Sequence, residues 1–93
     1  MYARIATFEG ATADIKAAMQ QATAEGPPEG LKSSEAYFFA DTGSGKSIFV
    51  TFFETEDDMK AGDALLNAMS PDDVGIGRRA SVDLMEVVAH MTA

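Results

Sequence analysis

The stretch from Tyr37 to Met59 constrains the fold of this chain more than any other. Two aromatic-rich apolar runs flank the polar segment Asp41 to Lys46, and the second run leads into Thr55, which three acidic residues follow. Apolar runs joined by a glycine-containing polar segment are typical of a β-hairpin, and a threonine followed by carboxylates is typical of a helix start. The stretch therefore predicts a strand, a turn, a strand and the start of a helix.

The turn in this stretch also resembles a phosphate-binding loop. Gly45, Lys46 and Ser47 match the end of such a loop, but Ala40 stands where its first glycine is needed. The residues after Ser47 are β-branched and aromatic, which predicts a strand at the point where a phosphate loop requires a helix. We therefore interpret Gly43 and Gly45 as hairpin glycines, and we expect no nucleotide binding.

Hydrophobic periodicity predicts four strands and two helices along the chain. Residues 2–8 alternate as a strand does, and the apolar residues after Thr12, which we expect to be the N-cap, recur at the spacing of an amphipathic helix that ends at Gly26. Further elements are expected as strands over 31–40, 48–53 and 82–91 and as a helix between Thr55 and Ser70-Pro71. The order βαββαβ predicts a ferredoxin-like α+β fold, with a four-stranded antiparallel sheet and two helices on one face.

Composition limits the size, the compartment and the partners of the protein. At 93 residues, the chain is expected to form one domain that spans residues 1–93. It has no cysteine, which excludes disulfides and thiolate metal sites and favours a reducing, cytoplasmic environment. Because no run approaches the roughly 20 apolar residues of a membrane span, we expect no membrane partner.

Charge argues against nucleic acid as a partner. The net charge is −8, from 15 acidic and 7 basic residues, and the basic residues are scattered, whereas nucleic-acid binding depends on clustered Lys and Arg. Residues 49–52 do match the end of the aromatic motif of RNA-recognition domains. However, residues 45–47 lack the pattern with which that motif begins, so we expect no RNA binding.

Two of the predicted strands carry apolar side chains on both faces. Strands 48–53 and 82–91 have large apolar residues at odd as well as even positions. Two helices on one side of the sheet would cover only one of these faces, and soluble monomers rarely expose a large apolar surface. We therefore predict a homodimer in which two copies pack through their open sheet faces.

Four polar residues form the best candidate for a ligand site. His90 is the only histidine of the chain and follows Glu86 by four positions in the last predicted strand, while Arg4 lies on the first strand, next to the last in this fold. If Tyr37 faced the same side, the four side chains could orient a small ligand in a dimer cleft. The alternative is a cross-strand ion pair with a histidine at the end of a strand.

Two further charged groups have a structural interpretation. The carboxylates at residues 54–58 lack the alternating, glycine-bearing loop of a calcium site, and three of them suit the first turn of a helix. We expect no metal site. Arg78 and Arg79 follow a glycine-containing segment with no helix start behind it, so we interpret them as part of a solvated loop, with an anion site as the alternative.

The chain as a whole resembles the dimeric α+β barrels, a superfamily that includes the antibiotic biosynthesis monooxygenases. The resemblance is carried by residues 1–10, the hairpin at 41–46, the helix entry at 53–59 and the closing strand at 82–87. It implies that two sheets pack into a barrel, with a cavity between each sheet and its helices or partner.

The resemblance leaves two functions open. The haem-degrading branch of the superfamily uses an asparagine, a tryptophan and a histidine, but this chain has no tryptophan, Asn67 lies late in the second helix and His90 lies in the last strand. Because no nucleophile, metal or cofactor constellation emerges, we expect a homodimer without a cofactor that binds a small apolar ligand. The alternative is a cofactor-independent monooxygenase that acts on a small aromatic substrate in the barrel cleft.

Overall fold

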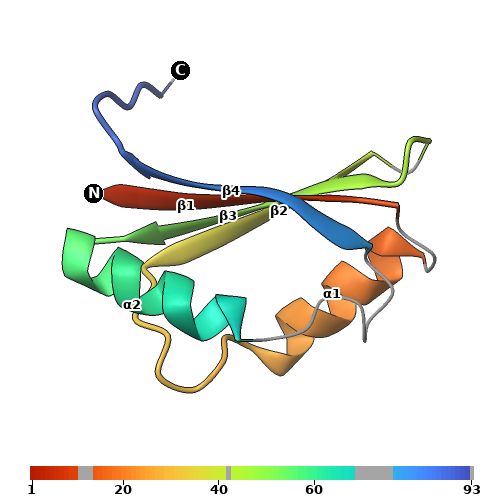
Figure 1. Ribbon diagram of the computed structural model, residues 1–93, viewed down its shortest axis with the longest axis horizontal. Helices are drawn as coiled ribbons and strands as arrows, with labels where there is room; N and C mark the ends of the chain where they lie inside the picture. The colour runs from red at the N-terminus through yellow and green to blue at the C-terminus, as the bar shows by residue number, and fades with distance from the viewer. Residues whose placement is uncertain (11–13, 42, 69–76, 93) are drawn as a thin grey trace.

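The computed structural model describes residues 1–10, 14–41, 43–68 and 77–92 (Figure 1). Four strands and two helices follow one another in the predicted order. They are β1 (Tyr2–Glu9), α1 (Ile15–Glu25), β2 (Glu35–Asp41), β3 (Lys46–Phe53), α2 (Glu56–Asn67) and β4 (Arg78–Glu86).

The strands form one antiparallel sheet in the order β2-β3-β1-β4. Both helices lie below the same face of the sheet in Figure 1, and no helix or strand of the described residues lies on the other face. The α+β class, the four-stranded antiparallel sheet and the two helices are thus confirmed, and the arrangement is compatible with a ferredoxin-like fold. No helix within the described residues is long and apolar enough to cross a membrane.

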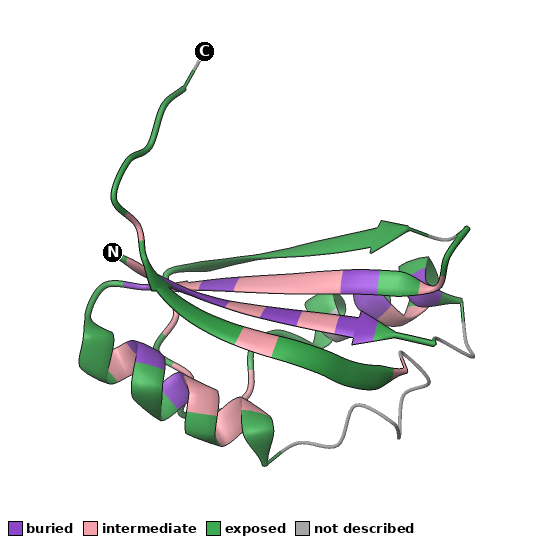
Figure 2. Cartoon of the chain, turned by 45° about the horizontal axis from the view of Figure 1, so that its top comes forward, coloured by how far each residue is buried: buried purple, intermediate pink, exposed green. Residues whose placement is uncertain are grey.

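Strand alternation assigns the side chains of the sheet to its two faces. Arg4, Ala6 and Phe8 of β1 are buried toward the helices, whereas Ile5 and Thr7 between them lie on the open face and are half-buried. The same alternation runs through β3, where the buried residues are Ser47, Thr51 and Phe53. The core therefore lies between the two central strands and the helices, and the edge strands β2 and β4 are mostly exposed (Figure 2).

The two helices begin at side chains that cap them. Thr55 accepts a hydrogen bond from the backbone N of Asp58 at 3.1 Å, and this confirms the predicted start of α2. In α1 the capping residue is Asp14, whose carboxylate accepts from Lys16 N and Ala17 N, so the assignment of Thr12 as the cap was wrong. Aspartate and threonine are both common helix caps, with aspartate the better of the two, so the sequence offered Asp14 as well as Thr12.

The hairpin between β2 and β3 has a strand, not a helix, after its glycines. The backbone N of Gly45 donates to the carbonyl of Asp41 at 3.0 Å, and Gly45 has a positive φ of 72°. Lys46 then pairs with Asp41 and Ser47 pairs with Ala40 in the ladder. The loop therefore lacks the helix N-terminus on which phosphate binding depends, as predicted.

Three predicted strands had wrong boundaries. β2 begins at Glu35 rather than residue 31, β3 begins at Lys46 rather than residue 48, and β4 covers Arg78–Glu86 rather than 82–91. β4 ends where Glu86 pairs with Tyr2, because β1 provides no partner beyond its own first residue. The predicted end of α2 at Ser70-Pro71 lies outside the described residues, within which the helix ends at Asn67.

Candidate functional site

Arg4 is the central polar residue beneath the sheet. Its side chain is only 5% exposed, and it reaches from β1 to α2, where its Nε donates to Asp63 Oδ1 at 2.8 Å. Its Nη2 donates to Asn67 Oδ1 at 3.1 Å. Because Asp63 and Asn67 are four residues apart on one helix face, they present their oxygens together. Arg4 therefore ties the sheet to α2 through charge-assisted hydrogen bonds.

A second guanidinium group approaches this cluster. Arg79 Nη1 donates to Asn67 Oδ1, the oxygen that also accepts from Arg4. The assignment of Arg78 and Arg79 to a loop was therefore wrong, because both residues belong to β4 and pair with Glu9 and Phe8 of β1. Two guanidinium groups and one carboxylate leave the cluster with one excess positive charge, in a chain of net charge −8.

Sequence reasoning had not singled out Asp63 or Asn67 as partners of Arg4. A signal was present, since two polar residues at i and i+4 share one face of a helix that must also face the sheet. The sequence alone does not show which face of α2 is turned toward the sheet. The packing of Met59 and Gly62, both buried against the sheet, sets that rotation.

The structure does not bring the four candidate ligand residues together within one chain. Glu86 lies on the same face as Arg4, but Arg4 pairs with Leu84, and Glu86 is displaced by two positions and exposed. Tyr37 lies on the opposite face, where its ring contacts Phe39 and Phe52. His90 lies beyond the end of β4 and is exposed.

The open face of the sheet carries the most prominent apolar surface of the described residues. Tyr37 and Phe39 of β2 are 51% and 53% exposed, and Met85 of β4 is 51% exposed. β3 lies between β2 and β1, and its residues on the open face, Ile48, Val50 and Phe52, are half-buried. The aromatic rings associate with one another, with 6.0 Å between the centroids of Tyr37 and Phe52 in an edge-on arrangement. The face is therefore apolar across β2 and β3 and reaches Met85 at the other edge.

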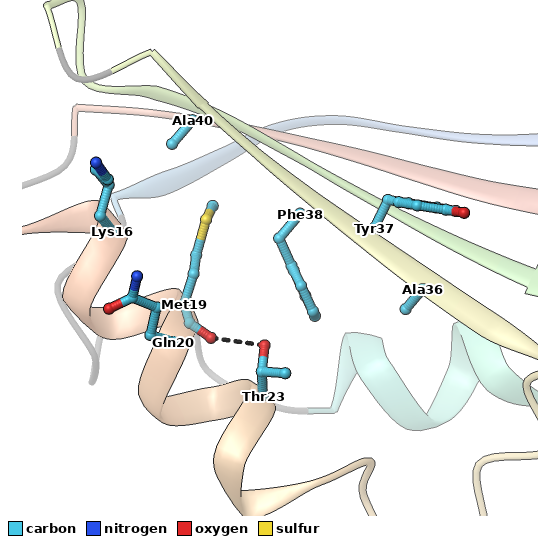
Figure 3. A pocket seen from close by; sticks show the side chains of 8 residues that line it. All are labelled: Lys16, Met19, Gln20, Thr23, Ala36, Tyr37, Phe38 and Ala40. Carbon is cyan, nitrogen blue, oxygen red and sulfur yellow. Dashed lines mark hydrogen bonds between the residues drawn. The ribbon is translucent and has the colours of Figure 1, made fainter.

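A groove lies on the helix side, between α1 and β2 (Figure 3). Its volume is about 680 Å³, and it is open to solvent along β2. Met19 and Phe38 point into it from the helix and the strand, whereas the ring of Tyr37 points away from α1. The complete lining is Lys16, Met19, Gln20, Thr23, Ala36, Tyr37, Phe38 and Ala40. The groove thus combines an apolar floor with polar groups along the helix.

One buried polar atom lies beside this groove. Ser47 is 1% exposed, and its Oγ has no hydrogen-bond partner among the described residues. Ser47 faces the helices and pairs with Ala40, which lines the groove. Buried hydroxyl groups nearly always find a partner, so Ser47 is the hydroxyl in this region that has hydrogen-bonding capacity to spare.

The acidic residues before and in α2 serve the helix itself. Glu56, Asp57 and Asp58 occupy its first turn, where the helix dipole favours carboxylates. Lys60 pairs with Glu56 at 2.8 Å, and the hydrogen bond that it donates to this carboxylate, followed by the negative charge of Glu56, raises the pKa of Lys60. Within the described part of the chain, no three His, Cys, Asp or Glu residues are placed to hold a metal ion.

The fold and these surfaces define an α+β protein with one helix-covered and one open apolar sheet face. Comparison with protein-family models, with curated proteins and with solved structures found no match to this chain. The resemblance to the dimeric α+β barrels therefore stays a prediction from the sequence.

Proposed function

We propose that this protein is a homodimer in which two sheets pack through their open faces, and that each subunit binds a small apolar ligand on its helix side. The observation that carries the first part is the half-exposed aromatic row on an otherwise uncovered face, with Tyr37 and Phe39 each more than 50% exposed. Large aromatic side chains contribute most to protein interfaces when a partner buries them.

The size of the open face agrees with a stable dimer. Four strands of about eight residues make a face of roughly 19 by 26 Å, or about 500 Å² in flat projection. The accessible area of projecting side chains exceeds this projection and approaches the roughly 800 Å² that each partner buries in a standard interface. Two such faces would pack about 10 Å apart with their side chains interdigitated.

The charges of the open face also permit close packing of two copies. By register, its carboxylates are Glu35 and Asp41 at the ends of β2, Asp83 on β4 and Glu9 at the end of β1. The first three belong to edge strands, and Glu9 lies 3.9 Å from the guanidinium of Arg78. The central strands β1 and β3 place no carboxylate on the middle of this face. Contact between the apolar centres of two copies would therefore bring few like charges together.

The groove between α1 and β2 is the proposed ligand site. Its volume of about 680 Å³ is within the usual range of small-molecule sites, and Met19 and Phe38 give it the apolar surface that such sites share. It lies on the helix side, so packing of the open faces would leave it accessible. Of the four residues considered for the ligand site, Tyr37 belongs to the lining of this groove, but its ring points away from α1, so turnover of an aromatic substrate is the second proposal behind binding.

Replacement of Phe39 by glutamate tests the dimer. We expect the wild-type chain to show twice its 9.8 kDa mass by light scattering at micromolar concentration, and Phe39→Glu to shift it to the monomer mass. Ala61→Glu is the matched control, because it adds the same charge at an exposed position of α2. A wild-type monomer, or equal masses for both variants, would contradict the proposal.

Replacement of Ala40 by tryptophan tests the groove. The fluorescent probe 1-anilinonaphthalene-8-sulfonate combines an aromatic body with one anionic group, and it should bind the wild-type dimer. Ala40→Trp would fill the groove and should weaken probe binding about tenfold or more, whereas Ala61→Trp on exposed α2 should not. Equal binding by both variants would remove the groove as the site while leaving the dimer untouched.

A further inference from the structure

The C-terminal segment, residues 87–92, leaves the sheet on its open side. It follows β4 without regular secondary structure, and Figure 1 shows it rising on the side opposite the helices. Its first residue is fixed, because the backbone N of Val87 donates to the carbonyl of Met1 at 2.9 Å. Beyond this point Val88 is 89% exposed and Met91 is 93% exposed.

The composition of this segment is unlike that of the rest of the chain. Charged residues make up 24% of the sequence, yet residues 87–92 contain none and include Val87, Val88 and Met91. Isolated exposed apolar residues need no explanation, but an uncharged apolar segment beside an apolar sheet face forms a continuous surface with that face. Two adjacent β-branched residues also favour an extended backbone.

The sequence of residues 87–92 and the direction in which they leave the sheet both argue against packing of this segment on its own sheet. The segment points away from the sheet (Figures 1 and 2), and a return would require a tight turn. Residues 87–92 contain no Gly, Pro, Asn or Asp, the residues that most readily form such turns. An extended backbone carries the segment away from the open face of its own sheet and toward a second copy that covers this face.

We infer that residues 87–92 of each subunit pack on the open face of the second copy, against Tyr37 and Phe52. This inference rests on the proposed dimer and adds a reciprocal strap to it. A two-fold axis parallel to the strands, between two facing sheets, places β4 of one copy over β2 of the other. Such an axis keeps every residue at the same position along the strand direction. The segment after Glu86 of one copy therefore lies near the row of residues across the second sheet that contains Tyr2.

Phe52 of the second copy lies one position from that row, and Tyr37 lies three positions from it, toward the middle of the sheet. Tyr2 pairs with Phe53, the neighbour of Phe52 in β3, and Phe52 pairs with Glu35 at the start of β2. Tyr37 is two residues further along β2, with its ring against Phe52. Met91 is five extended residues, or about 17 Å, beyond Glu86, which exceeds the roughly 10 Å between two facing sheets. Met91 can therefore reach this pair, where a thioether contacts aromatic rings favourably, and Val88 lies between the two sheets.

Shortening or charging the segment tests the strap. A chain that ends at Val87 keeps the hydrogen bond to Met1 and loses Val88 and Met91. We expect its dimer dissociation constant, measured by sedimentation equilibrium, to rise about tenfold or more, since two apolar side chains return to water. Met91→Asp in the full chain should weaken the dimer in the same direction, and Ala61→Asp on α2 is its matched control. Circular dichroism checks that each variant is folded.

Site-specific crosslinking tests where the segment lies. The wild-type chain has no cysteine, so single replacements report contacts without background. A mixture of Met91→Cys and Glu35→Cys chains should form a mixed disulfide dimer under mild oxidation. A mixture of Met91→Cys and Lys60→Cys chains should not, because Lys60 is exposed on α2, on the helix side.

The outcomes separate the strap from the dimer. A full chain that is monomeric at micromolar concentration overturns both. A full-length dimer whose affinity changes less than twofold on truncation, or crosslinks equally with both cysteine partners, overturns the strap and leaves the face-to-face dimer standing.

Discussion

At the scale of single residues, Gly62 shows that packing can reverse a helix preference. A Cβ atom at this position of α2 would lie 2.5 Å from Cζ of Phe53, whose side chain is fully buried. Alanine is favoured over glycine in a helix by about 1 kcal/mol, whereas overpacking a core costs about 1–3 kcal/mol. The difference between the two effects leads us to expect that Gly62→Ala lowers the free energy of unfolding by up to about 2 kcal/mol, measured by urea denaturation.

The control for this prediction is a variant with a smaller side chain at position 53. In a Phe53→Leu background the obstructing ring atoms are absent, so Gly62→Ala should be neutral or stabilising there. The double-mutant cycle isolates the contact, because the two residues touch and their effects are not additive. A Gly62→Ala protein that is more stable than the wild type would show that Phe53 can move aside.

At the scale of elements, the ion pair between Arg4 and Asp63 adds to the apolar packing that attaches α2 to the sheet. Asp63→Ala would leave the guanidinium of Arg4 buried with only the amide oxygen of Asn67 as a neighbour from α2. Loss of one partner of a buried pair costs about 3–5 kcal/mol, and the partial exposure of Asp63 places our expectation at about 2–4 kcal/mol. Urea denaturation of the two proteins measures the loss.

Two further variants distinguish charge from packing at this pair. Arg4→Met combined with Asp63→Leu should recover most of the stability, since a well-packed apolar pair can replace a buried ion pair. Lys60→Ala removes the exposed pair with Glu56 and should change stability little. If Asp63→Ala were as mild as Lys60→Ala, the ion pair of Arg4 would not hold α2 in place.

The elements also show what a sequence can and cannot predict. The order of the elements and the capping role of Thr55 follow from local signals, namely the periodicity and the side chain before a helix. The end of β4 and the face of Tyr37 depend on pairing with other strands, so they required the register. His90 illustrates the difference: the alternation of β4 continues to it in the sequence, but β1 begins at Tyr2 and provides no strand partner for it. Likewise, Asp63 and Asn67 could be identified as partners of Arg4 only once the structure showed which face of α2 is turned toward the sheet.

At the scale of the whole molecule, charge and apolar surface act in opposite directions on assembly. Each copy has a net charge of −8, so two copies repel each other while their open faces attract. Raising NaCl from about 0.02 M to about 0.5 M shortens the screening length from roughly 20 Å to roughly 4 Å. We therefore expect the dimer dissociation constant, measured by sedimentation equilibrium, to fall about fivefold or more over this range.

A variant with fewer charges provides the control for this salt dependence. Glu25→Gln with Glu29→Gln removes two exposed carboxylates, one in α1 and one in the loop that follows it. Its dimer should be tighter than the wild type at low salt and equal to it at high salt, because only the repulsion has changed. A dimer that weakens as NaCl rises would mean that ion pairs between the copies, and not the aromatic face around Tyr37 and Phe39, provide most of the affinity.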